Sequence, residues 1–180
     1  PENVLLLNLP SRFNSAATRN SAQQLAQALG ANYAVMPISE SYELTVKQLE
    51  ETPITNLADG SSFNLQLSGL IKENIQPRDR GARVIAAASA AFAGAFSCNS
   101  NKAELAIGYA TFYGDICGAM AMIGDLWKHQ VYALGHYLNE VIYKREVIPE
   151  AIFNIRPSAE LSDAQTVGNG GDPLVYGYHD

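Results

Sequence analysis

The pattern of apolar and polar residues in the first part of the chain predicts a strand, then a helix, then a second strand. Residues 4–7 form a continuous apolar run, typical of a parallel strand that is covered on both faces. A helix is expected next, capped by Ser15 or Thr18 and closed by Gly30. Its apolar face consists of Ala22, Leu25, Ala26 and Leu29. Residues 33–38 predict a second strand, and this order predicts a right-handed parallel crossover.

Helical patterns dominate the middle of the chain. A short helix is expected near residues 44–51, followed by a loop whose residues 59–62 have turn composition. A long helical region extends from about residue 65 to residue 92, with Pro77 and Gly81 as interruptions. A later helix is patterned by Trp127, Val131, Leu134 and Leu138. Residues 150–180 are rich in Pro, Gly and Asp and are expected to be mostly irregular.

Residues 93–98 read as a small buried strand, and the polar residues 99–101 that follow are typical of a helix cap. Helical spacing then continues at Ala103, Ala106, Ile107 and Ala110. Glu104 falls in the first turn, where the helix dipole favours a negative charge. A strand, a polar turn and a helix start form the usual mouth of an α/β site, and a helix N-terminus there can hold phosphate. The whole pattern predicts one α/β domain with an incomplete parallel sheet.

Composition narrows the class of protein. A chain of 180 residues with 47% hydrophobic residues is expected to form one domain with a substantial core. A net charge of −6 argues against a nucleic-acid-binding surface. No apolar run reaches the roughly 18 residues that a membrane span needs, and no signal peptide is evident at the start. Cys98 and Cys117 are too few for a disulfide framework, so a cytoplasmic location is expected.

The residues alone leave several alternatives open. Glu104 can be a simple first-turn acid, and Lys128 an ordinary surface lysine. The segment 73–83 can be a solvated helix face in which acids and arginines pair, and Ser158 a turn residue. The small residues at 85–91 can pack inside one subunit or against another copy of the chain. A lone His179 is assigned no role.

Four motifs resemble the signature of NAD synthetases. They are N-K-x-E at residues 101–104, G-Y-x-T-x-Y-G-D at 108–115, D-L-x-K at 125–128 and E-N-x-Q-x-R-x-R at 73–80. So many fixed residues at matching spacing make a specific signal. The resemblance implies the Rossmann-like adenine nucleotide alpha hydrolase fold of ATP pyrophosphatases, a parallel sheet with helices on both faces. The tail at 171–180 resembles the glutamine-dependent branch more than the ammonia-dependent one.

The resemblance also implies an activity, the ATP-dependent amidation of deamido-NAD to NAD. In that reaction the nicotinate carboxylate attacks the α-phosphorus of ATP, and ammonia, free or derived from glutamine, then displaces AMP. The expected cofactors are ATP and Mg²⁺, and a homo-oligomer is expected. Two other interpretations stay open: a different ATP pyrophosphatase ligase such as a GMP-synthetase relative, and a non-catalytic nucleotide-binding or dimerisation fragment.

Site residues follow from the same resemblance. The expected ATP-binding residues are Asn99, Lys128, Ser158, Ser11 and Arg12. The expected deamido-NAD-binding residues are Asn74, Arg78, Glu104, Tyr109 and Asp115, with Glu104 also the magnesium ligand. Asn99 departs from the family pattern, because a Thr usually stands at that position.

The pyrophosphate-binding loop S-G-G-x-D-S of the family does not occur in this sequence. Residues 59–62 and 169–172 contain similar residue types, but neither has the serine–glycine order or a preceding strand. In the family this loop lies upstream of the strand that opens the chain. Residues 1–180 are therefore expected to form a single partial domain that lacks the upstream loop and the C-terminal end.

Overall fold

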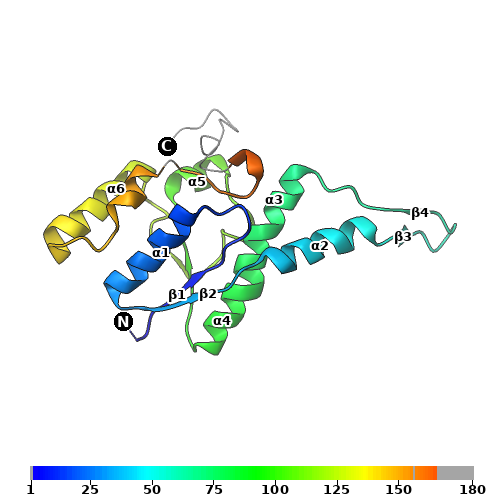
Figure 1. The fold of residues 1–180 in the computed structure, drawn as a ribbon. Coiled ribbons are helices and arrows are strands. Elements are labelled where there is room, and N and C mark those ends of the chain that lie inside the picture. The colour runs from blue at the N-terminus through cyan, green and yellow to red at the C-terminus, as the bar shows by residue number, and fades with distance from the viewer. Residues whose placement is uncertain (1, 156, 166–180) are drawn as a thin grey trace.

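The computed structural model describes residues 2–155 and 157–165 (Figure 1). Strand β1 (Leu5–Asn8) pairs in parallel with β2 (Asn32–Val35), and helix α1 (Ala16–Leu29) connects them. Ser15 caps α1, since its Oγ accepts a hydrogen bond of 3.2 Å from the Thr18 N–H. Gly30 closes the helix in the left-handed conformation, at φ 63°. The predicted β-α-β unit is confirmed.

A second parallel pair consists of β5 (Ser97–Cys98) and β6 (Met120–Ala121). The strand predicted at 93–98 is therefore shorter than expected, because Ala93 adopts a φ of 55° at the end of the preceding helix. Strand β6 was not predicted, because two residues carry no readable alternation. Gly118 permits this pairing: a Cβ there would lie 2.5 Å from the Cys98 backbone nitrogen.

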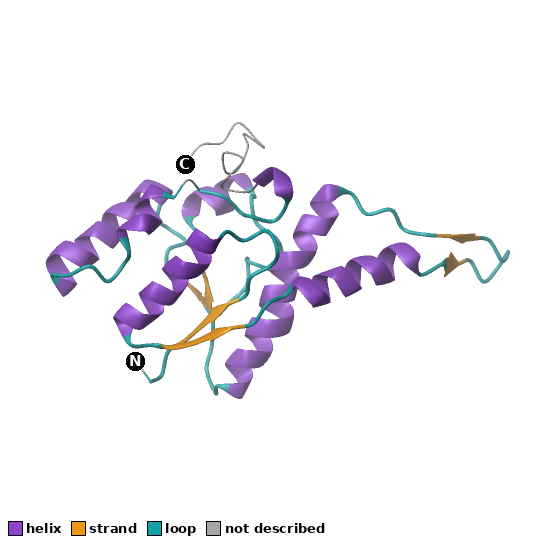
Figure 2. Cartoon of the chain, in the orientation of Figure 1, coloured by secondary structure: helices purple, strands orange, loops and turns teal. Residues whose placement is uncertain are grey.

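The two parallel pairs are separate two-stranded sheets among the described residues. Figure 2 shows both pairs in the middle of the molecule, between α1 and a long helical rod. A slot of about 640 Å³ is lined by β1 on one side and by residues of the β5–β6 pair on the other. The expected parallel sheet is present, and it is divided at this slot.

An arm projects from the body of the molecule (Figure 1). It consists of α2 (Ser39–Glu51) and an antiparallel hairpin of β3 (Ile54–Thr55) and β4 (Ser62–Phe63). The helix begins earlier than the predicted residue 44, and the hairpin replaces the predicted loop. The turn at 59–62 is confirmed, with Gly60 at a φ of 77° and the Asp59 carboxylate accepting from the Ser61 N–H at 2.8 Å.

The long rod consists of α3 (Gly69–Arg78), a π-helical segment η1 (Asp79–Ile85) and α4 (Ala86–Ala91). It begins at residue 69 rather than 65, because Ser68 caps α3. The helical region continues through Pro77 and Gly81, and the predicted interruption takes the form of a change from α-helix to π-helix after Arg78. Proline has no N–H, and the rod changes to π-type bonding two residues after Pro77.

The remaining helices surround the second strand pair. They are α5 (Lys102–Ile107), α6 (Lys128–Tyr137), the π-helical η2 (Leu138–Tyr143), α7 (Glu150–Asn154) and the 3₁₀ turn η3 (Asp163–Gln165). The helical spacing predicted to reach Ala110 stops at Gly108, which adopts a left-handed φ of 74°. Within the described part, no helix is long and apolar enough to cross a membrane. The tail at 171–180, residues 169–172 and His179 lie outside the described residues.

Candidate functional site

The rod and the turn at residues 111–117 touch backbone to backbone. A Cβ on Gly81 would lie 2.2 Å from the carbonyl oxygen of Gly114. A Cβ on Gly114 would lie 2.8 Å from Cβ of Pro77. Real Cβ atoms do not approach this closely, so this contact requires both glycines. The contact places the turn that carries Asp115 directly against the rod.

Polar bonds fix the same contact. The Thr111 hydroxyl donates to Oδ1 of Asn74 at 2.5 Å, and the Thr111 N–H donates to Oδ1 of Asp115 at 2.5 Å. Nε of Arg78 donates to the carbonyl of Phe112 at 3.2 Å. Asn74 and Arg78 therefore hold the turn from outside, and Asp115 stabilises it from within.

The start of α5 forms a capping box. Oδ1 of Asn101 accepts from the Glu104 N–H at 3.0 Å, and Oε2 of Glu104 accepts from the Asn101 N–H at 2.9 Å. These two bonds satisfy N–H groups that a helix end leaves without partners. Glu104 is therefore a first-turn acid, as the residues alone allowed, and the box fixes the orientation of its carboxylate.

A cavity of about 340 Å³ lies where the rod, the start of α5, the start of α6 and residues 157–161 meet. It gathers six of the predicted site residues in its wall: Asn99, Glu104, Tyr109, Asp115, Lys128 and Ser158. These residues are distributed over 60 positions of the chain, and the motifs that contain them converge on one cavity. The sequence alone did not predict which of these residues lie close together in the folded chain.

The other four predicted residues do not line this cavity. Asn74 and Arg78 lie behind the 111–115 turn, where they make the bonds described above. Ser11 is buried after β1, and its N–H donates to Oδ1 of Asn14 at 2.8 Å. Arg12 is exposed, with its guanidinium 4.7 Å from the centre of the Phe13 ring. Their proposed contacts with substrates stay predictions.

Ser158 is tied to the segment that follows it. Its hydroxyl donates to the carbonyl of Gln165 and accepts from the Glu160 N–H at 3.2 Å. The side chain of Gln165 in turn donates to the hydroxyl of Tyr109 at 3.3 Å. Ser158 is therefore a turn residue, which the sequence had left open as an alternative. The same bonds connect residues 157–165 to the cavity wall.

Arg80 lines the cavity and was not singled out from the sequence. Residues two positions apart do not share a face of a helix, so Arg78 and Arg80 cannot both face the cavity. Burial lowers the pKa of Arg80, and Asp79, Asp115 and Glu160 act in the opposite direction. An arginine remains charged at neutral pH under these conditions. The signal that could have identified Arg80 in the sequence is its place as the second arginine of the R-x-R motif.

Cys117 also lines the cavity. Burial raises the pKa of its thiol, and the neighbouring Cys98 and Asp115 raise it further. A thiol with a raised pKa is mostly protonated at neutral pH and is a poor nucleophile. The chemistry of the cavity therefore rests on its charged and hydroxyl groups.

A preformed metal cage is not part of this site. Among residues 2–155 and 157–165, no group of three or more His, Cys, Asp or Glu side chains is placed to hold a metal ion. Magnesium is commonly bound by one or two carboxylates together with substrate phosphates. Glu104 and Asp115, which both line the cavity, fit that donor set.

Comparisons with known proteins identify the family of the chain. A family model described as NAD synthase matches residues 1–170. The chain is 36% identical over 165 residues to the glutamine-dependent NAD(+) synthetase of Xanthomonas campestris, covering 92% of this chain and 28% of that protein. It is 29% identical to the NH(3)-dependent NAD(+) synthetase of Campylobacter jejuni, covering 92% of this chain and 57% of that protein.

Solved structures share the fold. The NMN synthetase of Francisella tularensis superimposes with a TM-score of 0.71 at 25% identity, over 90% of this chain and 58% of that one. A glutamine-dependent NAD+ synthetase of Acinetobacter baumannii, in complex with ADP, gives a TM-score of 0.69 at 26% identity, over 88% of this chain and 28% of that one. The predicted α/β fold of ATP pyrophosphatases is confirmed. The chain spans between about a quarter and three fifths of the length of these proteins, and it belongs to the NAD synthase family.

Proposed function

We propose that this chain is the synthetase part of an enzyme that amidates deamido-NAD to NAD, with ATP and ammonia as co-substrates. The observation that carries the proposal is the convergence of Glu104, Lys128 and Ser158 on one cavity. These residues supply a carboxylate, a cation and a hydroxyl from three separate segments, which are the groups needed to bind a nucleoside triphosphate. The names of the matched proteins include both glutamine-dependent and NH(3)-dependent synthetases, so either source of ammonia is compatible with the proposal.

Lys128 is proposed to hold ATP phosphates. It is the first residue of α6, where the helix dipole disfavours a positive side chain. The N–H groups of a helix start attract a phosphate, and the Lys128 ammonium adds a positive charge at the same place. Asn99 and Ser158 add neutral hydrogen-bonding groups to the same wall. Ser11 and Arg12, which lie outside the cavity, are proposed to contact ATP from the loop after β1.

The first chemical step is an adenylation. A carboxylate oxygen of deamido-NAD forms a bond to the α-phosphorus of ATP, and the bond from that phosphorus to pyrophosphate breaks. Negative charge accumulates on phosphate oxygens in this step, so fixed cations in a partly enclosed cavity stabilise its transition state. Ammonia then attacks the acyl carbon, AMP leaves, and the ammonium proton is released to water.

Glu104 would hold Mg²⁺ together with nucleotide phosphates. A magnesium ion supplies charge neutralisation and orientation of the phosphates when it is bound. The capping box with Asn101 keeps the Glu104 carboxylate in one orientation. Asp115 is proposed to orient the acceptor from the opposite wall.

Deamido-NAD is proposed to contact Tyr109, Asp115 and Glu104 in the cavity, with Asn74 and Arg78 reached across the 111–115 turn. Tyr109 is connected through Gln165 to the segment that carries Ser158. The 111–115 turn, which Asn74 and Arg78 hold, therefore lies between these two residues and the deamido-NAD residues proposed in the cavity.

We also propose that this reaction requires chain beyond these 180 residues. The slot lies between β1 and the β5–β6 pair, so strands border it on both sides. A strand paired with both sides would complete a single parallel sheet. The loop at its carboxyl end would open toward the ATP side of the cavity, as expected of an α/β site.

The test is an assay of AMP release and NAD formation with ATP, Mg²⁺, deamido-NAD and ammonium, using the full-length protein. Formation of NAD and AMP in equal amounts would support the proposal. Nucleotide binding without AMP release would instead favour a non-catalytic nucleotide-binding role. AMP release only with a different acceptor, such as a purine nucleotide, would favour another ligase of the same fold.

A homo-oligomer is proposed as well. None of the residues of α4 is buried, although this helix is made of small residues, and Phe92 at its end is 41% exposed. Small side chains let helices approach closely, which suits a contact with a second copy. Light scattering of the full-length protein at micromolar concentration is the test, and a monomer mass would contradict the proposal. A cytoplasmic location stays a prediction.

A further inference from the structure

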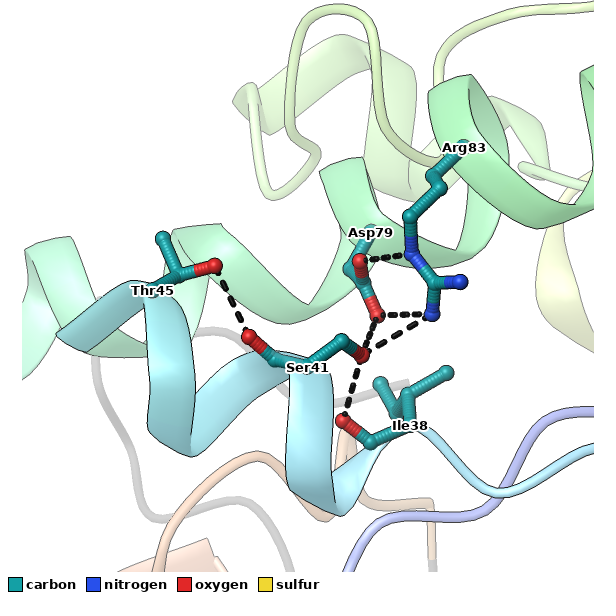
Figure 3. A network of polar contacts seen from close by, with 5 residues as sticks. All are labelled: Ile38, Ser41, Thr45, Asp79 and Arg83. Carbon is teal, nitrogen blue, oxygen red and sulfur yellow. Dashed lines mark hydrogen bonds and ion pairs between the residues drawn. The ribbon is translucent and has the colours of Figure 1, made fainter. Parts of the chain in front are cut away.

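Three arginines of the rod take three different directions. Arg78 is exposed and bonds to the carbonyl of Phe112. Arg83 pairs with Asp79 and bonds to the hydroxyl of Ser41 on α2, as Figure 3 shows. Arg80 alone of the three lines the cavity. The two neighbours are therefore engaged in contacts within the protein, and Arg80 is the one directed to the site.

Arg80 is held by two acceptors on the segment after β1. Its Nε donates to the carbonyl of Leu9 at 2.9 Å, and its Nη2 donates to Oδ1 of Asn14 at 3.3 Å. A guanidinium has five N–H groups, so three remain, and these have no acceptor among the described residues. Arg80 lines the cavity and is only half-buried, so these groups are available to an acceptor that a ligand supplies there.

Asn14 cannot turn its amide over without losing bonds. Its Oδ1 accepts from the Ser11 N–H at 2.8 Å as well as from Arg80. Its Nδ2 donates to Oε2 of Glu160 at 3.1 Å. The other carboxylate oxygen of Glu160 accepts from the Ser15 N–H at 3.1 Å, and Glu160 is only 3% exposed. A buried carboxylate thus sets the orientation of Asn14, and Asn14 sets that of Arg80.

The same carboxylate fixes another part of the wall. Glu160 lies two residues after Ser158, and its N–H donates to the Ser158 hydroxyl at 3.2 Å. Its side chain anchors residues 157–161 to the start of α1. Arg80 and Ser158 therefore enter the cavity from different segments that share one anchor.

We infer that Arg80 binds an oxyanion of the nucleotide substrate, and that Asn14 and Glu160 are positioning residues for it. The planar fork of arginine matches two oxygens of a phosphate or carboxylate at once, whereas the ammonium of Lys128 is a compact charge without a fixed fork. This inference rests on the proposed function for the identity of the ligand. It deepens that proposal by naming the arginine that binds an oxyanion of the nucleotide.

The first test measures the dissociation constant for ADP in the full-length protein. Arg80→Gln is expected to weaken binding roughly tenfold to a hundredfold, because charge-assisted hydrogen bonds are lost. Arg83→Gln, three residues on and outside the cavity, is the matched control and is expected to change binding less than about twofold. Equal ADP affinity in Arg80→Gln and the wild type would overturn the inference.

The second test keeps Arg80 and exchanges the donor and acceptor of its anchor. Glu160→Gln alone places two amide groups with donors facing each other, and Asn14→Asp alone places two carboxylates together. The double variant Asn14→Asp/Glu160→Gln restores one donor and one acceptor and conserves the net charge. Each single variant is expected to weaken ADP binding at least roughly fivefold, and the double variant to recover it to within about threefold.

Two readouts separate positioning from mere stability. If the single variants lower the melting temperature and leave the ADP dissociation constant unchanged, Glu160 and Asn14 are only structural and the inference is overturned. Failure of the proposed function would look different. A wild-type protein that binds ADP in an Arg80-dependent way and forms no NAD would contradict the proposed reaction and support the oxyanion site.

Discussion

The cavity and the slot are both hollows beside parallel strands, yet they are built differently. The cavity wall is fixed by a capping box, by two glycines that permit backbone contact, and by a buried carboxylate. The slot is lined mostly by aliphatic and aromatic side chains around β1. Its size exceeds that of the cavity, about 640 Å³ against 340 Å³. The cavity wall carries the charged residues Arg80, Glu104, Asp115 and Lys128, whereas none of the described residues that line the slot is charged. This difference agrees with a polar ligand in the cavity and with the strand proposed for the slot.

The largest effect is expected from the part of the protein that is proposed to fill the slot. Residues 1–180 alone are expected to form no measurable NAD, because the S-G-G-x-D-S loop that the family resemblance implies for pyrophosphate binding does not occur in this sequence. Losing one preorganised oxyanion donor reduces a rate on the order of a hundredfold or more, and such a loop supplies several. The measurement is NAD formation with ammonium as the nitrogen donor. Comparable turnover by these residues and by the full-length protein would contradict the role of the slot.

Glu104→Gln tests the cavity in the full-length protein. The amide preserves the size of the side chain and can still accept from the Asn101 N–H, while the charge that would hold Mg²⁺ is removed. AMP release is expected to fall roughly a hundredfold or more, since a metal ion contributes several kcal/mol to phosphoryl chemistry. An unchanged melting temperature is the control for folding. Near-normal turnover of the folded variant would rule out the metal role.

Lys128→Ala is expected to act on one substrate. The kcat/KM for ATP should fall roughly tenfold to a hundredfold, because a charge-assisted contact to phosphate is lost. The affinity for deamido-NAD should stay nearly constant. Initial rates with each substrate varied in turn provide the measurement. If the ATP kinetics do not change, Lys128 is a surface lysine.

Gly81→Ala tests how closely the rod and the turn must approach. The added Cβ would lie 2.2 Å from the Gly114 carbonyl oxygen, so the backbone must shift. A loss of about 1–3 kcal/mol in the free energy of unfolding is expected. Gly69→Ala, with nothing within 4 Å of its added Cβ, is the matched control and should be neutral or stabilising. Equal destabilisation by both substitutions would refute the close contact.

The smallest effect is expected outside both hollows, at the cluster of Ser41, Asp79 and Arg83 (Figure 3). Partial burial raises the pKa of Asp79, but hydrogen bonds from Arg83 and Ser41 outweigh it and lower the pKa overall. A lowered pKa contributes stability above the unfolded value, and that contribution disappears as the pH falls through the folded value. Asp79→Asn should therefore cost below about 1 kcal/mol at pH 7 and nothing measurable near pH 2. Urea unfolding at both pH values tests this, and an equal loss at both would contradict the pKa direction.

Much of the fold was readable because local chemistry decides it. The helix from Ser15 to Gly30 was predicted from its cap, its apolar face and its glycine, and all three act as expected. The two-residue strands β3, β4 and β6 could not be predicted, because pairing with another segment defines them and periodicity does not. The rod was predicted to be interrupted at Pro77, and it continues there as a helix of a different type.

The site divides in the same way. Motif spacing identified Glu104 and Lys128, both of which line the cavity. It named Arg78 and not Arg80, because which arginine faces the cavity depends on how the rod is rotated against the 111–117 turn. Asn14 and Glu160 were beyond the sequence altogether, since they lie 146 residues apart and their bond exists only in the folded chain.

The π-helical segment η1 adjusts the angular phase of the rod. A single residue corresponds to about 100° of rotation in an α-helix, so one residue added to or removed from residues 79–85 would turn α4 by that angle relative to α3. The direction of Arg80 and the direction of the small residues of α4 are therefore fixed relative to each other by this segment. A one-residue deletion there would redirect either the cavity arginine or the outer face of α4, whichever end is less firmly anchored. The π-helical segment thus keeps the proposed oxyanion site and the proposed subunit contact in register.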